Sequence, residues 1–187
     1  MKFSSATATI GASFIVIAAL AGCSSNSNSA SSTTTSAAVP AADSTSPSAK
    51  WLIAVHEDDL AEQQAGALAQ KSGSTQPVRD TGAMLVSDHA LIDAGITMLA
   101  QQHNVPLPSQ LNDTLTAEMT KLDGLQGAAF DKEFVTFFIA GHQGAVKATQ
   151  GEIATAGQPA DVIGYAKVVL PVIQRHLADL EMDNTAH

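Results

Sequence analysis

The sequence predicts an all-α protein, a four-helix bundle made of two helical hairpins joined by a long crossover that contains a short helix. Composition is the first indication. Of the 187 residues 45% are hydrophobic but only 4% are aromatic, and a core built from aliphatic side chains favours helices over strands. Periodicity is the second, because apolar residues recur at alternating spacings of four and three in four long segments, as in helices that bury one face. Connectivity is the third, since a short turn, a long crossover and another short turn separate these segments.

The composition also excludes several classes of protein. The chain has 9 Lys and Arg residues against 18 Asp and Glu residues, a net charge of −9. It therefore lacks the basic face that nucleic acid requires, and no nucleic-acid partner is expected. The single cysteine excludes a disulfide within the chain and a zinc finger. The sequence also contains no phosphate-binding glycine loop and no Gly-x-Ser-x-Gly hydrolase motif.

Residues 1–22 are expected to form a lipoprotein signal peptide. Their apolar run, 10–20, is shorter than the roughly 20 residues of a membrane-spanning helix. It ends in Leu20-Ala21-Gly22-Cys23, which resembles a bacterial lipobox with the only cysteine at the lipidated position. We expect Cys23 to carry lipid and to anchor a periplasm-facing lipoprotein of the cell envelope, and Ser24 favours the outer membrane. The alternative is an ordinary cleaved signal with an incidental cysteine.

Residues 23–49 are expected to form a disordered tether. Ser, Thr, Ala and Asn dominate them, with little charge and no apolar periodicity, so the segment cannot bury enough apolar surface to fold. A flexible chain of about 26 residues reaches roughly 25–30 Å. The bundle domain is expected to cover residues 50–184.

The first hairpin is predicted from two periodic segments. The first ends at the turn Ser72-Gly73-Ser74. The second is expected to open at Gln76-Pro77, because proline suits the first turn of a helix, and to stop before the Pro-rich segment 104–108. Its seam is the most regular in the chain: Val78, Gly82, Leu85, His89, Ile92, Ile96 and Leu99.

The crossover and the second hairpin follow. A short helix is expected around 116–125, packed across one end of the bundle. The third long helix should run from about Phe130 to Ala156, and the turn Gly157-Gln158-Pro159 should lead to the fourth, about 161–182. Gly141 and Gly144 weaken the third helix, which leads us to expect a close helix–helix approach there.

Four polar residues occupy positions where a bundle helix normally places an apolar side chain: Glu62, His89, His142 and His176. If both short turns lie at the same end of the bundle, the four residues lie at depths of about 15, 20, 22 and 24 Å from it, at 1.5 Å per residue. Each long helix therefore contributes one polar group near mid-height.

One carboxylate and three imidazoles are a suitable ligand set for a transition metal such as Zn, Cu, Fe or Mn. Asp88, next to His89, is expected to orient an imidazole rather than to ligate. The alternative is a metal-free network in which the four side chains satisfy one another. His56 lies off this stripe and is expected at the surface or the rim of the layer.

One residue and four segments of the chain match the pattern of a known family. The family's four motifs, in chain order, are Glu-x-x-x-Gly-x-Leu-Ala, Met-Val-x-Asp-His, Phe-Asp-x-x-Tyr followed by Gly-His, and Leu-Pro-x-x-x-x-His-Leu. Phe134 replaces the usual tyrosine, and Trp51 stands where the family has phenylalanine. The matching segments are Trp51, 62–69, 84–89, 130–142 and 170–177. On these segments the chain resembles the domain of unknown function 4142 family, whose members are often envelope lipoproteins.

The resemblance implies a ferritin-like bundle but no specific activity. The Glu-x-x-His pairs of ferritin-like di-iron enzymes are absent from the sequence, so a mononuclear site or no metal is expected, and the protein is not expected to be an enzyme. Three readings remain: a metal-binding envelope protein, a structural or protein-interaction module with unknown partners, and, more weakly, a redox enzyme.

Overall fold

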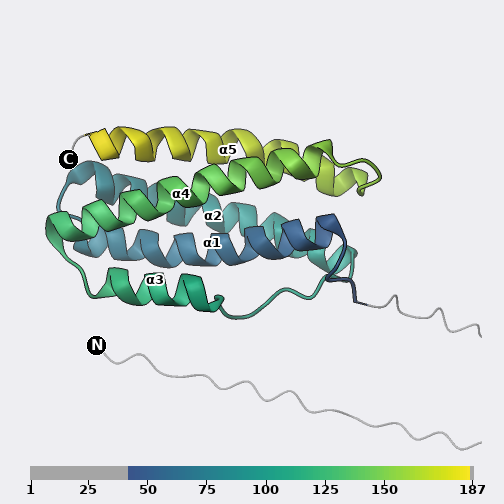
Figure 1. Ribbon diagram of the computed structural model, residues 1–187, viewed down its shortest axis with the longest axis horizontal. Helices are drawn as coiled ribbons and strands as arrows, with labels where there is room; N and C mark the ends of the chain where they lie inside the picture. Colours follow the sequence, from purple (N-terminus) through teal and green to yellow (C-terminus); the bar gives the residue numbers. More distant parts are fainter. Residues whose placement is uncertain (1–41, 186–187) are drawn as a thin grey trace, which may run out of the picture. The chain divides into compact units, whose positions relative to one another are not determined.

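The computed structural model describes residues 42–185. The signal peptide, Cys23 and most of the expected tether lie outside these residues. Five helices follow one another along the described chain (Figure 1): α1 (Pro47–Ser72), α2 (Gln76–Gln102), α3 (Asp113–Asp123), α4 (Gly127–Ala154) and α5 (Ala160–Thr185). The predicted all-α class, the two hairpins and the short helix in the crossover are confirmed.

Side-chain caps fix where the first three helices begin. Ser46 accepts a hydrogen bond from the backbone N–H of Ala49, and Thr75 does the same for Val78. Asn112 caps α3 in the same way. Each cap satisfies one of the N–H groups that a helix leaves unpaired at its start. Proline stands in the first turn of both α1 and α2, as expected for a residue without an N–H.

The backbones of α1 and α2 approach each other closely through two glycines. A Cβ added to Gly66 would lie 2.5 Å from the carbonyl oxygen of Gly82, and one added to Gly82 would lie 2.7 Å from that of Gly66. The close approach expected at Gly141 and Gly144 is wrong, because no atom of a neighbouring helix in the described part of the chain lies within 4 Å of a Cβ built at either position. The small residues that set the helix spacing are therefore in the first hairpin.

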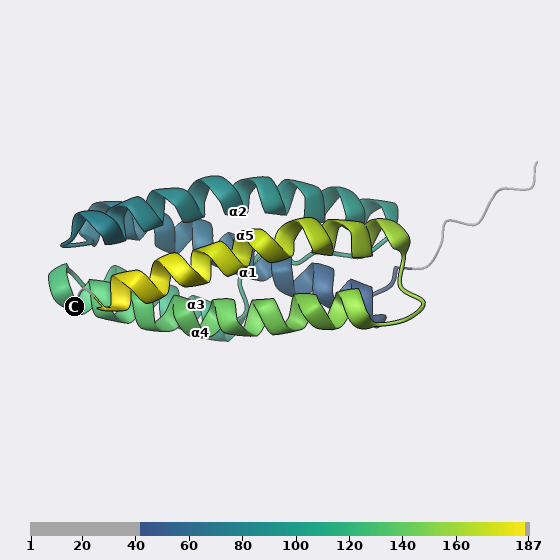
Figure 2. The same cartoon turned by 90° about the horizontal axis from the view of Figure 1, so that it is seen from above.

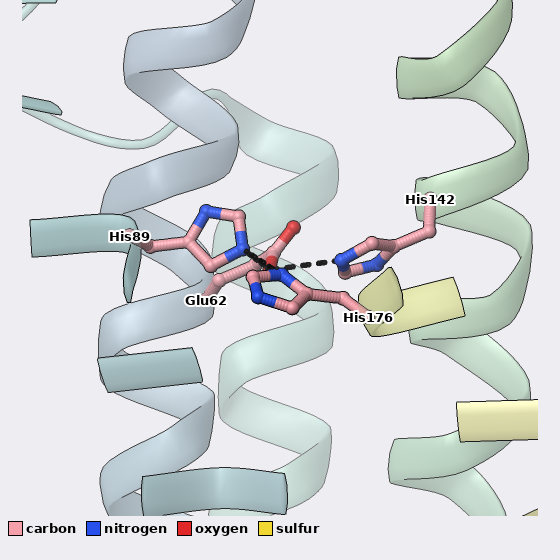
Figure 3. Close-up of side chains that lie close together, drawn as sticks. All are labelled: Glu62, His89, His142 and His176. Carbon is pink, nitrogen blue, oxygen red and sulfur yellow. Dashed lines mark hydrogen bonds and ion pairs between the residues drawn. The ribbon is translucent and has the colours of Figure 1, made fainter. Parts of the chain in front are cut away.

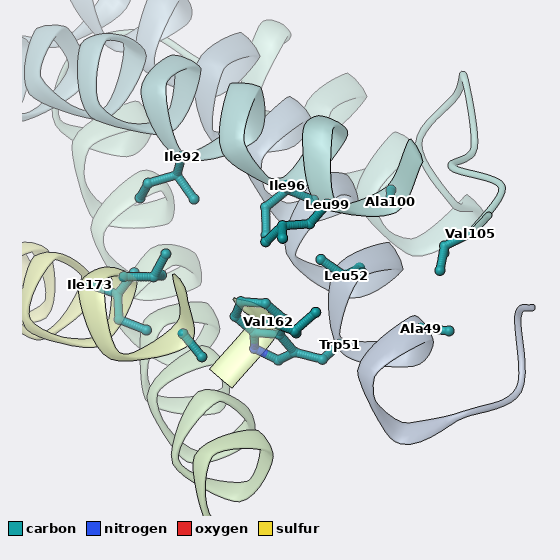
Figure 4. Packing of buried hydrophobic residues seen from close by; sticks show 12 residues of the cluster. Ala49, Trp51, Leu52, Ile92, Ile96, Leu99, Ala100, Val105, Val162 and Ile173 are labelled. Atoms are coloured by element: carbon teal, nitrogen blue, oxygen red, sulfur yellow. The ribbon is translucent and has the colours of Figure 1, made fainter. Parts of the chain in front are cut away.

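The aliphatic and aromatic side chains form two clusters at different heights of the bundle. One gathers around Trp51, Leu52 and Ile96 (Figure 4), and the other around Phe130 and Phe134. Each long helix carries one of the four polar residues, at the point where its buried residues change from one cluster to the other. The core is thus divided by a polar layer at mid-height.

Helix α3 lies against the outside of the bundle, alongside α1 and α4 (Figures 1 and 2). It buries Met119 and Leu122 in the second cluster. The crossover that contains it carries the chain between the two hairpins, so α4 and α5 can pack back onto α1 and α2.

Candidate metal centre

Four side chains, one from each long helix, converge at the centre of the bundle (Figure 3). Glu62 comes from α1, His89 from α2, His142 from α4 and His176 from α5. Each offers one ligand atom, and these four atoms all lie within 4.8 Å of one another. All four side chains are buried; His142 and His176 are 0% exposed. The structure therefore brings together the set expected from the sequence, in a group that could hold a metal ion.

The inward-facing atoms are arranged around the carboxylate. Glu62 Oε2 lies 2.6 Å from His89 Nε2 and 3.5 Å from His142 Nε2, and His89 Nε2 lies 3.1 Å from His176 Nδ1. Yet Glu62 Oε2 and His142 Nε2 have no partner in hydrogen-bond geometry within residues 42–185. Leaving a buried polar atom without a partner costs about 1–3 kcal/mol, so the layer is incomplete as a hydrogen-bond network.

The outward-facing nitrogen of each imidazole, in contrast, has an oxygen acceptor. His89 Nδ1 lies 2.6 Å from Asp59 Oδ1. His142 Nδ1 lies 2.9 Å from the carbonyl oxygen of Phe138, and His176 Nε2 lies 3.0 Å from Asp88 Oδ2. Nη2 of Arg175 also lies 3.3 Å from His176 Nε2. A carbonyl oxygen only accepts, so Nδ1 of His142 carries the proton, and the carboxylates of Asp59 and Asp88 favour a proton on the outer nitrogens of His89 and His176. The inner nitrogen of a neutral imidazole is then free to donate its lone pair to a metal.

Charge in the layer centres on Glu62 and His89. Burial alone would lower the pKa of His89, but the charge of Glu62 and the hydrogen bond to Asp59 outweigh burial and raise this pKa to about 10. Burial would raise the pKa of Glu62, but the charges of His89 and His142 bring it below its ordinary value. Burial lowers the pKa of His176 to about 4. At neutral pH the layer thus contains a carboxylate, a protonated His89 and a neutral His176.

Asp59 is a site residue that the sequence did not reveal. It is 1% exposed, and burial raises its pKa to about 7 although the hydrogen bond to His89 lowers it. Asp59 lies in the middle of α1, which begins at Pro47. The signal that could have found Asp59 is its spacing of three from Glu62, which places both carboxylates on one helix face.

Asp88 lies at the seam between α2 and α5, where it links the buried layer to the surface. Its Oδ2 contacts His176, as described above, and lies 2.5 Å from Nη2 of Arg175. The side chain of Asp88 is 26% exposed and that of Arg175 is 56% exposed. The aspartate next to His89 in the sequence therefore faces the imidazole of His176 instead.

The surface position expected for His56 is wrong. His56 is 8% exposed; its Nδ1 lies 2.5 Å from Asp93 Oδ1, and its Nε2 lies 3.0 Å from the carbonyl oxygen of Pro108. These contacts join α1 to α2 and to the start of the crossover. His56 is thus a buried, hydrogen-bonded residue on the flank of the bundle.

Comparison with known proteins agrees with the sequence resemblance. Neither the curated proteins nor the solved structures include a match to this chain. The family model described as domain of unknown function (DUF4142) matches residues 32–182, which cover all of the site residues and almost all of the helices. The chain therefore belongs to the DUF4142 family.

Proposed function

We propose that this protein binds one transition-metal ion through Glu62, His89, His142 and His176, as a metal-binding lipoprotein of the cell envelope. The observation that carries the proposal is a pair of buried atoms at the centre of the layer, Glu62 Oε2 and His142 Nε2, which have no partner in hydrogen-bond geometry although Glu62 Oε2 lies 2.6 Å from His89 Nε2. Both are electron-pair donors, and both face the two remaining ligand atoms. A cation at this point would satisfy all four.

The outer contacts also support coordination over a metal-free network. A satisfied network needs protons between its members. Asp59, Phe138 and Asp88 draw one proton of each imidazole to the outside of the layer, so the inner atoms share only the second proton of His89, which lies toward Glu62. Outer acceptors of this kind fix the ring and raise the basicity of a ligating imidazole. Because most of the inner atoms are then lone pairs that face one another in an apolar core, they repel unless a cation lies between them.

The ligand chemistry selects a class of metal. Three imidazoles and one carboxylate suit Zn, Cu, Fe or Mn, whereas Ca²⁺ and Mg²⁺ prefer an all-oxygen site. The site has one carboxylate among its four ligand residues, which fits a mononuclear centre and not a carboxylate-bridged pair of metals. We propose a metal-binding role without catalysis.

The proposed location follows from the sequence before the bundle. The tetrapeptide ending at Cys23 supports lipidation, and the polar residues that follow it support a tether to the membrane. The membrane, reached through that lipid, is the partner we propose. Intact-mass measurement of protein extracted from membranes tests this location, and a mature chain without added lipid mass would contradict it.

Elemental analysis tests metal binding directly. Protein isolated from the envelope, without a metal-affinity column, should contain about one transition-metal ion per chain. The variant His142→Ala should lose this metal. The variant His103→Ala is the matched control, since His103 pairs with Asp161 at the surface and should keep the metal. Absence of metal in the native protein, or equal metal in both variants, would refute the proposal.

A further inference from the structure

The metal centre has a small cavity beside it. Glu62 and His89 line this cavity together with apolar side chains of α2 and α5, among them Ile92 and Ile173, which are labelled in Figure 4. Its volume is about 20 Å³, and a space of roughly 10–15 Å³ is enough for one water molecule. Room for one small molecule therefore exists next to two of the four ligand residues.

The cavity also offers polar partners to a small molecule. Asp59 lines it and is 1% exposed, and Asp59 Oδ2 has no hydrogen-bond partner in the described part of the chain. Asp58 lies on the same wall. A buried water needs two to four polar partners, and these carboxylates together with Glu62 supply them.

A groove on the surface leads toward this cavity. The groove runs between α1 and α4, has a volume of about 360 Å³ and contains Trp51. Val55, Asp58 and Ala145 line both the groove and the cavity, so these three side chains form the wall that separates the metal centre from the surface. The surface of the groove as a whole is mostly apolar, which suits passage of a small neutral molecule.

We infer that the metal centre is of the open kind, with a position for one exchangeable ligand of the size of water in this cavity. The inference rests on the proposed metal binding and adds to it a ligand class: water, or a neutral molecule of similar size that replaces it. Closed structural sites have four protein ligands in a tetrahedron, whereas open sites keep a position for water or substrate. The cavity between Glu62, His89 and the shared wall provides that position.

Cobalt(II) is the probe for this inference, because its visible absorption is intense in a tetrahedral site and several-fold weaker when a fifth ligand is bound. The full chain is loaded with Co²⁺, and bound metal is measured independently by elemental analysis. Wild-type protein should give the weak spectrum. The variant Ala145→Leu fills the cavity from α4 and should give a several-fold more intense, tetrahedral spectrum at the same metal content.

Two further variants complete the experiment. Val169→Leu adds one carbon to the cavity wall from α5 and should have the same effect, which keeps the test decisive if Ala145→Leu does not fold. Ala140→Leu, at an exposed position of α4, is the matched control and should retain the weak spectrum. An intense spectrum in the wild type, or a spectrum unchanged by both filling variants, would overturn the open position. Failure of the wild type to bind Co²⁺ would instead refute the proposed function and remove the basis of the inference.

Discussion

The variant Glu62→Leu distinguishes a metal-binding site from a metal-free hydrogen-bond network by its effect on the free energy of unfolding. In the metal-free protein the substitution removes a buried oxygen that has no partner in hydrogen-bond geometry, which relieves a cost of about 1–3 kcal/mol, but it also removes the 2.6 Å ion pair of that oxygen with His89. It also removes the charge that raises the pKa of His89, so His89 can lose its proton and no uncompensated buried charge remains. Because the lost pairing with His89 opposes this relief, we expect the free energy of unfolding to fall by less than about 3 kcal/mol.

Added metal should then distinguish the two proteins. A metal that binds only the folded state, at 100 times its Kd, stabilises wild-type protein by about 2.7 kcal/mol, or roughly 5–10 °C in Tm for a chain of this size. Glu62→Leu should gain almost nothing. Urea unfolding in chelator and in metal-containing buffer measures both effects. A loss above about 3 kcal/mol in the metal-free variant would show that Glu62 belongs to a satisfied network, and full metal stabilisation of the variant would exclude Glu62 as a ligand.

Three further predictions concern the layer and its support. The pKa of His89 is raised from 6.5 to about 10, so its contribution to stability is complete below pH 6.5 and is lost as the pH rises to 10. The Tm of metal-free protein should therefore fall over this pH range in thermal melts, and it should fall less steeply with pH in Glu62→Gln. Asp59→Ala removes the acceptor of His89 Nδ1–H and should weaken metal binding by about 10- to 100-fold in a chelator competition titration; wild-type affinity would contradict its orienting role. Gly82→Ala should lower the free energy of unfolding in urea by about 1–3 kcal/mol, because the added Cβ would meet the backbone of α1. Gly144→Ala, where a Cβ meets no neighbouring helix, should raise it by up to about 1 kcal/mol. Equal effects of the two substitutions would contradict the close packing of α1 and α2 at Gly82.

Much of the fold could be predicted from the sequence because a bundle helix has a single apolar face, and its period appears directly in the chain. The polar layer was predictable for the same reason. His89 interrupts a seam that is otherwise apolar, and each of the four residues lies near the middle of its own helix. Counting depth from both short turns as one end of the bundle is wrong, because the turns lie at opposite ends: Ser48 at the start of α1 donates to Gln158 of the second turn, whereas Ser74 of the first turn donates to Asp131 of α4. The layer was still predicted because residues near mid-helix have similar depths from either end. Residues on different helices at one depth meet in a bundle of antiparallel hairpins.

The contacts around the layer could not be predicted in this way, because they depend on how each helix is rotated and how closely its neighbour approaches. Asp88 faces His176 across the α2–α5 seam rather than the adjacent imidazole. His56 is hydrogen-bonded to the carbonyl oxygen of Pro108 in the crossover, which lies 52 residues away in the sequence. The glycines that permit close packing are Gly66 and Gly82, and the sequence pattern does not give the distance between two helix backbones.

The placement of the site between the hairpins gives metal binding a structural consequence. Glu62 and His89 belong to the first hairpin, whose backbones are held close by glycine, while His142 and His176 belong to the second. Neither hairpin alone supplies more than two ligands, so the complete set exists only when the two hairpins are docked. An ion bound by all four residues would therefore cross-link the hairpins at mid-height, at the level where the two apolar clusters are separated. Because the unfolded chain does not preserve this arrangement, the free energy of metal binding would contribute directly to the stability of the docked bundle.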